Sequence, residues 1–407
     1  MRSRLRDVIV VGAGPGGSAT AHFLSQRGLD VLLVDRAAFP RDKTCGDGLT
    51  PRALRVLERM SILAEVAAQG CRVEGYQVVA PNGRDTTAPI RTQHGALVVP
   101  RFKLDDIIVR RAQRSGAHLE SRLTVSHLEP TPRGVRVHAH DGRVFDARVA
   151  VVATGAATGV PRRSGILTSQ PRAMLAARTY FEGIPHDLER RFQLRFDGTP
   201  MPGYGWVFPT DRASANVGVG FLPGRHSSTA TRAFDAFVAG RALQPLLRGA
   251  HQAGPLKGYP IRVDFLSAPT AGERTLLVGE AAGLVNPLTG EGIDYALECG
   301  MLAAEHVVHG LETGLDRAWS AEYDRLLRAR WEKIFRFSEW IRDWYCKPLV
   351  LNLLVTLANR RPELRQLLAS IVLGEREPRG FGPASMLVRL LAYLARHPGE
   401  APAGIAE

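Results

Sequence analysis

The chain has 407 residues and a formal net charge of +13, from 53 Lys and Arg against 40 Asp and Glu. Its hydrophobic content of 45% and charged content of 23% are those of a globular protein with two domains or one large core. No uncharged apolar run reaches the ~18 residues that span a bilayer. The four cysteines lack metal-ligand spacing, so we expect no metal site. No nucleic-acid motif accompanies the positive charge, so we expect no nucleic-acid partner.

A strand at the start of the chain runs into a glycine-rich turn and then into a helix of small residues. Residues 9–35 read IVVGAGPGGSATAHFLSQRGLDVLLVD. Gly12 permits a tight turn, Gly14 lets the backbone approach a pyrophosphate, and Gly17 allows close packing of the helix on the sheet. The helix N-terminus offers N–H groups to phosphates, and Asp35 ends the second strand, where a carboxylate accepts hydrogen bonds from ribose hydroxyls. We therefore predict a pocket for an adenine dinucleotide, FAD or NAD; the alternative is a glycine-rich turn in an ordinary α/β protein.

The other elements are predicted from hydrophobic spacing, β-branched runs and turn residues. In chain order they are a helix near Pro51, short strands within 75–100, a helix opened by Arg101, alternating strands near 122–129, 134–140 and 143–147, a buried strand at 149–153, several strands within 172–221, a helix at 229–247, a buried strand at 273–283 followed by a long helix, and helices from about 316 onward with apolar segments at 349–357, 364–373 and 386–395. This order predicts a discontinuous dinucleotide domain that is interrupted by a β-rich insertion.

Three segments together resemble the FAD-dependent geranylgeranyl reductase family, within the hydroxylase-like flavoprotein superfamily. The first is the dinucleotide segment with the loop Cys45-Gly46-Asp47-Gly48 behind it. The second is PGYGWVFP at 202–209, followed by NVGVG at 216–220. The third is Gly279-Glu280, continuing to NPLTGEGI at 286–293. The resemblance covers about residues 5–312 and implies FAD as the cofactor.

The third segment suits a flavin on physical grounds as well. A strand ending at Gly279-Glu280 presents a carboxylate to ribityl hydroxyls, and Pro287 can lie flat beside the isoalloxazine ring. The turn from Gly290 to Gly292 aims helix N–H groups at the flavin edge that becomes negative on reduction. The family usually has Asp where this chain has Glu280, which is one methylene longer. A glycine-capped structural helix is the alternative interpretation.

Two further residues are assigned by the resemblance. Arg101 is similar to the family's flavin-contacting arginine, and Cys45 lies where a family cysteine sits close to the flavin and tunes it or helps to protonate substrate. The alternatives are a surface arginine and a small buried hydrophobe. The loop at 153–156, ATGA, departs from the Asp-Gly common in relatives, so no contact is assigned to it. The predicted cofactor-binding residues are Gly12, Gly14, Gly17, Asp35, Arg36, Cys45, Gly46, Arg101, Gly279, Glu280, Pro287, Gly290, Gly292 and Ile293, and Cys45 is also the predicted catalytic residue.

The predicted fold is α/β, with a Rossmann-like FAD-binding domain of the glutathione-reductase type, an inserted β-rich substrate domain and a C-terminal helical region. We expect the FAD-binding domain in three parts at 1–74, 101–160 and 271–315, the substrate domain at 75–100 and 161–270, and the helical region at 316–407.

Aromatic residues alternate in the second segment. Tyr204, Trp206 and Phe208 would lie on one face of a strand. The resemblance implies that they line a tunnel for a prenyl chain, whereas the alternative is that they fill the core between sheet and helices. Arg41 and Arg52 are candidates to hold a diphosphate on such a substrate.

The resemblance implies a reductase that transfers hydride from reduced FAD to carbon–carbon double bonds of an isoprenoid, either a geranylgeranyl chain or the prenyl chain of a quinone or lipid. Because no second dinucleotide motif is present, we expect NADPH or another reduced carrier to supply electrons transiently. The alternative is an FAD-dependent monooxygenase of secondary metabolism acting on an apolar or aromatic small molecule, and a third is a binding subunit with a structural flavin. A halogenase is disfavoured because the chain lacks a Trp-x-Trp-x-Ile-Pro segment.

The basic C-terminal helices contain Trp331, Trp340, Trp344 and Tyr345. Aromatic and cationic faces suit peripheral membrane contact, and packing onto the rest of the protein is the alternative. Because the first strand starts within about seven residues of the first methionine, leaving no room for a signal peptide, we expect a cytoplasmic protein with possible membrane association.

Overall fold

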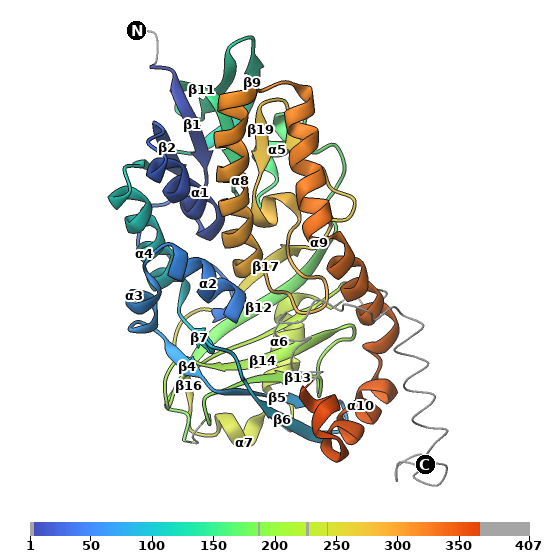
Figure 1. Cartoon of the computed structure of the whole chain (residues 1–407). Helices are drawn as coiled ribbons and strands as arrows, with labels where there is room; N and C mark the ends of the chain where they lie inside the picture. Colours follow the sequence, from blue (N-terminus) through green and yellow to red (C-terminus); the bar gives the residue numbers. More distant parts are fainter. Residues whose placement is uncertain (1–3, 186–187, 225–227, 242, 367–407) are drawn as a thin grey trace.

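The computed structural model describes residues 4–366 except 186–187, 225–227 and 242, and two eight-stranded sheets dominate it (Figure 1). Parallel strands form the centre of the first sheet, in the order β19-β11-β1-β2-β8. Both faces of this sheet are covered, which explains the continuous apolar runs 8–11 in β1, 31–34 in β2 and 149–152 in β11. The strands of the first sheet are β1 (Arg6–Val11), β2 (Val31–Asp35), β8 (His118–Ser121), β9 (Val125–Thr131), β10 (Gly134–Ala139), β11 (Val144–Val152), β18 (Ala271–Gly272) and β19 (Thr275–Leu277).

Strand β11 corrects one sequence prediction. The strands expected at 143–147 and 149–153 form a single element, because the first half of β11 pairs with β10 and the second half with β1. Ala147 takes part in both pairings, opposite Val135 on one side and Arg6 on the other. The helix expected at 229–247 is divided in the opposite way, into α6 (Ala230–Val238) and α7 (Gln244–Leu247), with helix-disfavouring Gly240 between them.

Helices cover the first sheet and extend its core. Figure 1 shows α1 beside α8, and α8 beside the first half of α9. Trp319, Tyr323 and Trp331 of α9 are buried in the same hydrophobic core as β1 and β11. These helices and their neighbours are α1 (Pro15–Gln26), α2 (Pro51–Arg59), α3 (Leu63–Ala67), α4 (Arg101–Arg114), α5 (Gly159–Arg163), α8 (Ile293–Thr313), α9 (Arg317–Tyr345) and the 3₁₀ turn η1 (Gly279–Ala282).

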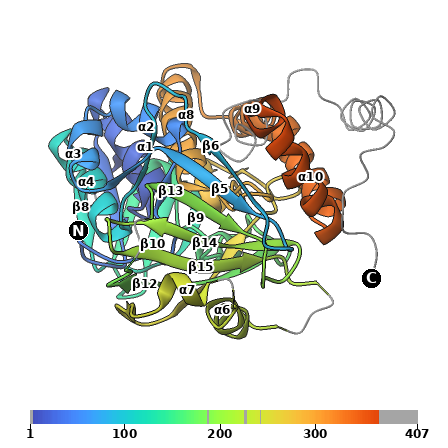
Figure 2. The ribbon, with the colours of Figure 1, turned by 90° about the horizontal axis from the view of Figure 1, so that it is seen from below.

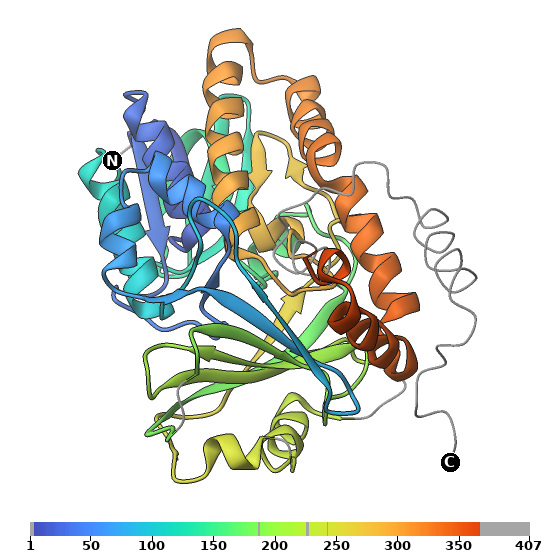
Figure 3. The same cartoon turned by 60° about the horizontal axis from the view of Figure 1, so that its bottom comes forward.

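The second sheet has the order β16-β12-β15-β14-β13-β5-β6, with β17 also paired to β12. Figure 3 shows α6 and α7 on one side of this sheet and the first sheet with its helices on the other. A small sheet, β3-β7-β4, accompanies them. The strands are β3 (Gly48–Leu49), β4 (Cys71–Val73), β5 (Gly75–Val79), β6 (Asp85–Pro89), β7 (Ala96–Val98), β12 (Ala173–Glu182), β13 (Arg191–Arg195), β14 (Gly203–Pro209), β15 (Ala215–Phe221), β16 (His251–Gln252) and β17 (Lys257–Arg262).

The C-terminal region divides its aromatic residues between core and surface. Trp331 is buried, Trp340 is half-buried and Trp344 is 62% exposed, so packing onto the rest of the protein accounts for Trp331, while Trp344 lies on the surface. Helix α10 (Pro348–Arg360) lies beside β6 at the edge of the second sheet (Figure 2). None of the helices described here is long and apolar enough to cross a membrane. The side chain of Tyr345, the apolar segment expected at 386–395 and most of that at 364–373 lie outside the described residues.

Candidate active site

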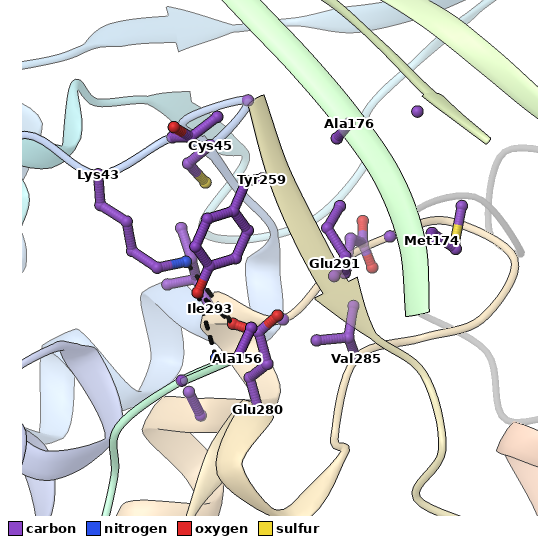
Figure 4. Close-up of a pocket in the computed structure, with 18 of the residues that line it drawn as sticks. Lys43, Cys45, Ala156, Met174, Ala176, Tyr259, Glu280, Val285, Glu291 and Ile293 are labelled. Atoms are coloured by element: carbon purple, nitrogen blue, oxygen red, sulfur yellow. Dashed lines mark hydrogen bonds and ion pairs between the residues drawn. The ribbon is translucent and has the colours of Figure 1, made fainter. Parts of the chain in front are cut away.

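A cavity of about 890 Å³ lies between the two sheets, at the upper end of the ~300–1,000 Å³ typical of ligand sites. Both sheets contribute to its walls, and so do α9 and α10. Figure 4 shows part of it. The structure brings nearly all the predicted site residues to this cavity; those that line it are Gly12, Gly14, Asp35, Arg36, Cys45, Gly46, Arg101, Tyr204, Trp206, Phe208, Glu280, Pro287, Gly290, Gly292 and Ile293. Gly17 and Gly279 are not among the lining residues.

The three glycines of the opening turn face different surroundings. Gly12 has φ +104°, and a Cβ there would lie 2.4 Å from the Ala153 carbonyl oxygen. A Cβ on Gly17 would lie 1.8 Å from the Gly12 carbonyl oxygen. For Gly14 the nearest atom to such a Cβ is Nη2 of Arg41, at 3.6 Å. The protein's own packing therefore requires Gly12 and Gly17, whereas the space beside Gly14 is left to the cavity.

Two helix N-termini border the cavity without side-chain caps. Gly14 is the N-cap of α1 and Gly292 is the N-cap of α8, and in neither case does a side chain accept a cap hydrogen bond. Pro15 at the start of α1 has no N–H, and the Asp294 carboxylate in α8 accepts from the backbone N–H of Tyr295. The helix-start residues Gly16 and Ile293 line the cavity, so their N–H groups are the candidates to bind a ligand. Asp35 lies close to the first of them, and its carboxylate accepts hydrogen bonds from the N–H groups of Ala13 (2.7 Å) and Ala37 (2.8 Å). This arrangement fits the phosphates, ribose and isoalloxazine of FAD.

Arg101 is buried rather than on the surface, with only 3% of the residue exposed. Its Nε and Nη2 donate to the two carboxylate oxygens of Asp105 at 2.7 and 2.8 Å, and Nη1 of Arg41 lies 3.0 Å from Asp105 Oδ2. Burial opposes the charge on Arg101, but Asp105 and Cys45 outweigh this effect and raise its pKa. The cavity wall therefore carries the permanently charged guanidinium of Arg101 next to Cys45.

Glu280 faces protein partners that its motif does not predict (Figure 4). Its carboxylate accepts hydrogen bonds from the backbone N–H of Arg262 (3.1 Å) and the hydroxyl of Tyr259 (3.3 Å), and Nζ of Lys43 lies 3.6 Å away. Burial would lower the pKa of Lys43, but the Glu280 carboxylate outweighs it and raises this pKa. The hydroxyl of Tyr259 also accepts a hydrogen bond from the N–H of Ala156, in the loop that departs from the family pattern.

Sequence reasoning missed Lys43 and Tyr259 as wall residues. The one available signal was the extra methylene of Glu280, which lets its carboxylate extend toward β17.

The aromatic side chains of β14 form one wall of the cavity, as the alternation predicts. Tyr204 and Trp206 have ring centroids 6.2 Å apart, and Trp206 and Phe208 have centroids 6.3 Å apart. The indole N–H of Trp206 donates to Oδ1 of Asn216 at 2.9 Å, and the hydroxyl of Tyr204 donates to the carbonyl of Thr289. This wall therefore connects the second sheet to the turn that precedes α8.

A buried hydrogen-bond network that the motifs did not predict holds the Cys45 loop. The side chain of Asn216 donates from Nδ2 to the Cys45 carbonyl at 2.7 Å and to Oδ2 of Asp47 at 2.8 Å. The hydroxyl of Tyr180 donates to the same Asp47 oxygen at 2.6 Å. Asp47 is fully buried, and burial raises its pKa from 3.8 to about 6. The network fixes the loop against the aromatic wall, where a Cβ on Gly46 would lie 3.2 Å from Phe208.

Helices α9 and α10 also contribute residues to the cavity wall. No motif predicted this contribution, because the resemblance ends near residue 312. The lining residues from these helices and the turn between them are Ile341, Arg342, Cys346, Leu351, Leu354 and Val355.

Comparison with known proteins places this site in a family. Residues 6–313 match the model of the FAD-binding domain family. Menaquinone reductase of Mycobacterium tuberculosis is 37% identical over 320 residues, which cover 74% of this chain and 76% of that protein. Digeranylgeranylglycerophospholipid reductase 1 of Methanopyrus kandleri is 32% identical over 346 residues, which cover 81% and 87%. The crystal structure of a geranylgeranyl bacteriochlorophyll reductase-like protein from Thermoplasma acidophilum has the same fold, with a TM-score of 0.78 and 21% identity over 91% of this chain and 100% of that one.

These matches confirm the fold class, the FAD-binding domain and the resemblance that the three sequence segments indicated. The family model covers both halves of the glycine-rich cradle, and the two relatives match most of the chain at identities of 37% and 32%. The chain therefore belongs to the FAD-binding domain family of flavin-dependent oxidoreductases, in the group that contains the menaquinone and digeranylgeranylglycerophospholipid reductases.

Proposed function

We propose that this protein is an FAD-dependent reductase that saturates carbon–carbon double bonds in the prenyl chain of an isoprenoid lipid or quinone. The observation that carries the proposal is a single cavity in which a dinucleotide cradle continues into an apolar, aromatic-walled space. The names of the two relatives, a menaquinone reductase and a prenyl-lipid reductase, support the same substrate class.

The chain's own residues bind FAD, orient the alkene and exclude water from the site. Gly14, Asp35 and Arg101 would hold FAD, together with the N-termini of α1 and α8. When bound and reduced, FAD supplies a hydride. An unactivated alkene has no carbonyl that could be polarised, so its reduction depends on close positioning and on exclusion of water. The wall formed by Trp206 and Phe208 meets both needs by packing against the prenyl chain.

Saturation of each double bond also consumes one proton. We propose that the thiol of Cys45 donates this proton, because the thiol lines the cavity in a loop that packs against the aromatic wall. Arg101 lies close enough to interact electrostatically with Cys45. Asp47 and Asn216 are positioning residues in this scheme, since their hydrogen bonds hold the Cys45 loop in place.

Access for a lipid substrate is proposed at the junction of α9 and α10. Trp344 is 62% exposed and Leu349 is 77% exposed there. Between them in sequence is Cys346, which lines the cavity. We propose that this junction touches a membrane surface from the cytoplasmic side, and that NADPH or another reduced carrier supplies the electrons.

An anaerobic single-turnover experiment tests the reaction. The FAD-loaded protein is reduced, excess reductant is removed, and geranylgeranyl diphosphate or a prenylated naphthoquinol is added while flavin absorbance and product mass are followed. We expect flavin reoxidation and a gain of two hydrogens per double bond. Turnover that needs oxygen, with a gain of one oxygen atom, would show a monooxygenase instead.

Replacing Cys45 tests the proton assignment in the same assay. Loss of a proton donor costs about 10²- to 10⁴-fold in rate, so Cys45→Ala should bind FAD normally and reduce the alkene slowly. A rate within a few-fold of wild type would remove Cys45 from the reaction.

A further inference from the structure

Arg342, in the last turn of α9, is a buried cation in the apolar part of the cavity wall. Its side chain is 2% exposed. The neighbouring wall residues from α9 and α10 are apolar or neutral; they are Ile341, Cys346, Leu351, Leu354 and Val355. The other guanidinium groups that line the cavity, those of Arg36, Arg41, Arg101 and Arg163, belong to the FAD-binding elements or to the adjoining α5.

The terminal nitrogens of Arg342 lack hydrogen-bond acceptors among the residues that the structure describes. Nε donates to Oδ1 of Asp343 at 2.7 Å. Nη2 lies 3.7 Å from Oε1 of Glu339, which is too long for a hydrogen bond. Both Nη1 and Nη2 are shielded from solvent and have no hydrogen-bond partner. Leaving buried N–H donors unmatched is costly, so an acceptor supplied from the cavity would stabilise this end of the site.

The charges around Arg342 are already balanced. Asp343 and Glu339 oppose Arg342, and Arg172 approaches the same Glu339 oxygen at 3.4 Å. Cys346 adds no negative charge, because burial raises the pKa of its thiol to about 12. Among the residues that the structure describes, no free cation lines this part of the wall, so a diphosphate would bring several unmatched negative charges into it, which is unfavourable. A neutral carbonyl oxygen would accept from Arg342 without disturbing the balance.

Resting on the proposed function, we infer that Arg342 recognises the polar end of the substrate by donating hydrogen bonds to a neutral carbonyl oxygen, such as the ring carbonyl of a prenylated quinone. The two arginines that the sequence offered for a diphosphate are engaged elsewhere. Arg41 pairs with Asp105, and Arg52 lies 3.5 to 3.8 Å from carboxylate oxygens of Glu298 and Asp294. Arg342 is therefore the residue that selects the head group, while the aromatic wall accommodates the chain.

A cycle of protein and ligand changes tests this assignment. The oxidised, FAD-loaded full chain is titrated with a prenylated naphthoquinone, with the same prenylated naphthalene lacking both carbonyls, and with geranylgeranyl diphosphate, and Kd is read from the change in flavin absorbance. The variants are Arg342→Met and Arg342→Lys. Arg336→Met is the matched control, because Arg336 is on the same helix, 66% exposed and paired with Glu332.

A hydrogen bond to a charged donor is worth about 10- to 100-fold in affinity. We expect wild type to bind the quinone tighter than the naphthalene by that factor, Arg342→Met to abolish the difference by weakening the quinone alone, and Arg342→Lys to retain part of it. The control should match wild type.

Other results overturn the assignment. Equal losses for quinone and naphthalene would mean that Arg342 only packs, and a loss confined to geranylgeranyl diphosphate would mean that it holds an anion. Equal affinities of wild type for quinone and naphthalene would sink the inference even if the Met variant failed to fold. If wild type with bound FAD recognised none of the three compounds, the proposed function would fall too, so the two failures are distinguishable.

Discussion

Gly14 and Gly17 are three residues apart, yet packing within the protein requires only Gly17, whereas Gly14 is needed only for the proposed approach of phosphates. A Cβ at Gly17 would overlap the Gly12 carbonyl at 1.8 Å, whereas a Cβ at Gly14 meets nothing closer than 3.6 Å. We expect Gly17→Ala to lose about 3 kcal/mol or more of stability, because helix α1 must move off the strand. Gly14→Val should fold normally and purify without FAD, because its side chain occupies the phosphate approach.

Circular dichroism and the flavin-to-protein absorbance ratio separate the two outcomes. A folded Gly14→Val variant that retains stoichiometric FAD would contradict the cradle as described.

Asp47 is expected to make the stability of the protein depend on pH. Burial raises its pKa from 3.8 to about 6, so the folded state favours the protonated carboxyl. Its contribution to stability is therefore complete below pH 3.8 and is lost as the pH rises through about 6. Two pKa units correspond to roughly 3 kcal/mol. Asp47→Asn does not titrate, so the unfolding free energy of wild type relative to this variant should fall by up to about that amount between pH 4 and 7.5.

Urea unfolding of both proteins at several pH values measures this difference. A difference that stays constant across the window would show that folding does not raise the pKa of Asp47.

The contacts of Asp47 show which part of the site local motifs do not predict. The Cys45-Gly46-Asp47-Gly48 loop was recognised, and the structure places it at the cavity. Its supports, Tyr180 and Asn216, lie on β12 and β15, more than 130 residues further along the chain. A local pattern carries no information on such pairs, because their proximity is created by the packing of one sheet against another.

At the scale of elements, the pair β14 and β15 shapes the aromatic wall. Trp206 is directly opposite Gly218 in the antiparallel register, and a Cβ on Gly218 would lie 2.2 Å from the indole. A Cβ on Gly220 would meet the same ring only at 3.6 Å. We expect Gly218→Ala to displace the indole and to destabilise the protein by about 1–3 kcal/mol, whereas Gly220→Ala should change stability by less than about 1 kcal/mol.

Thermal unfolding of the two variants makes the comparison within one strand. Equal stabilities would mean that Trp206 can leave its position freely, and the wall would then not be a fixed surface.

Alternation along β14 was sufficient to predict that its three aromatic residues share a face. The role of NVGVG was not predictable from that strand alone, since it follows from the register that sets Gly218 under Trp206. Strand β11 illustrates the same limit, because two predicted strands became one when β10 and β1 paired with successive halves of it. Periodicity predicts faces well, whereas pairing partners decide where an element begins and ends.

At the scale of the whole molecule, α9 joins the two functional halves. Its first turns bring Trp319 and Tyr323 into the core of the FAD-binding sheet, and its last turn brings Arg342 to the cavity. The sequence predicted helices here, but it did not predict which of their residues pack on the FAD-binding sheet and which line the cavity. Amphipathic spacing shows that a helix has a buried face and does not show what that face packs against. A truncation after residue 316 would remove Trp319 and Tyr323 from this core and destabilise the protein, so it cannot test membrane contact.

Point changes at the α9–α10 junction test that contact without unfolding the protein. Trp344 and Leu349 are 62% and 77% exposed, and Lys347 lies between them with Nζ 5.5 Å from the Trp344 ring. Burying one large apolar side chain is worth about 1.5–3 kcal/mol, so replacing both residues by Ser should weaken sedimentation with phosphatidylglycerol vesicles by at least about 10-fold. Leu326→Ser, on the same helix and 38% exposed, is the control and should sediment like wild type.

Turnover of a detergent-dispersed prenyl substrate should survive in the double variant, because neither Trp344 nor Leu349 lines the cavity. Loss of vesicle binding with retained turnover would identify the junction as the route by which a lipid substrate enters. Unchanged sedimentation of the double variant would mean that substrate reaches the aromatic wall from solution, and the exposed pair would then have no part in delivery.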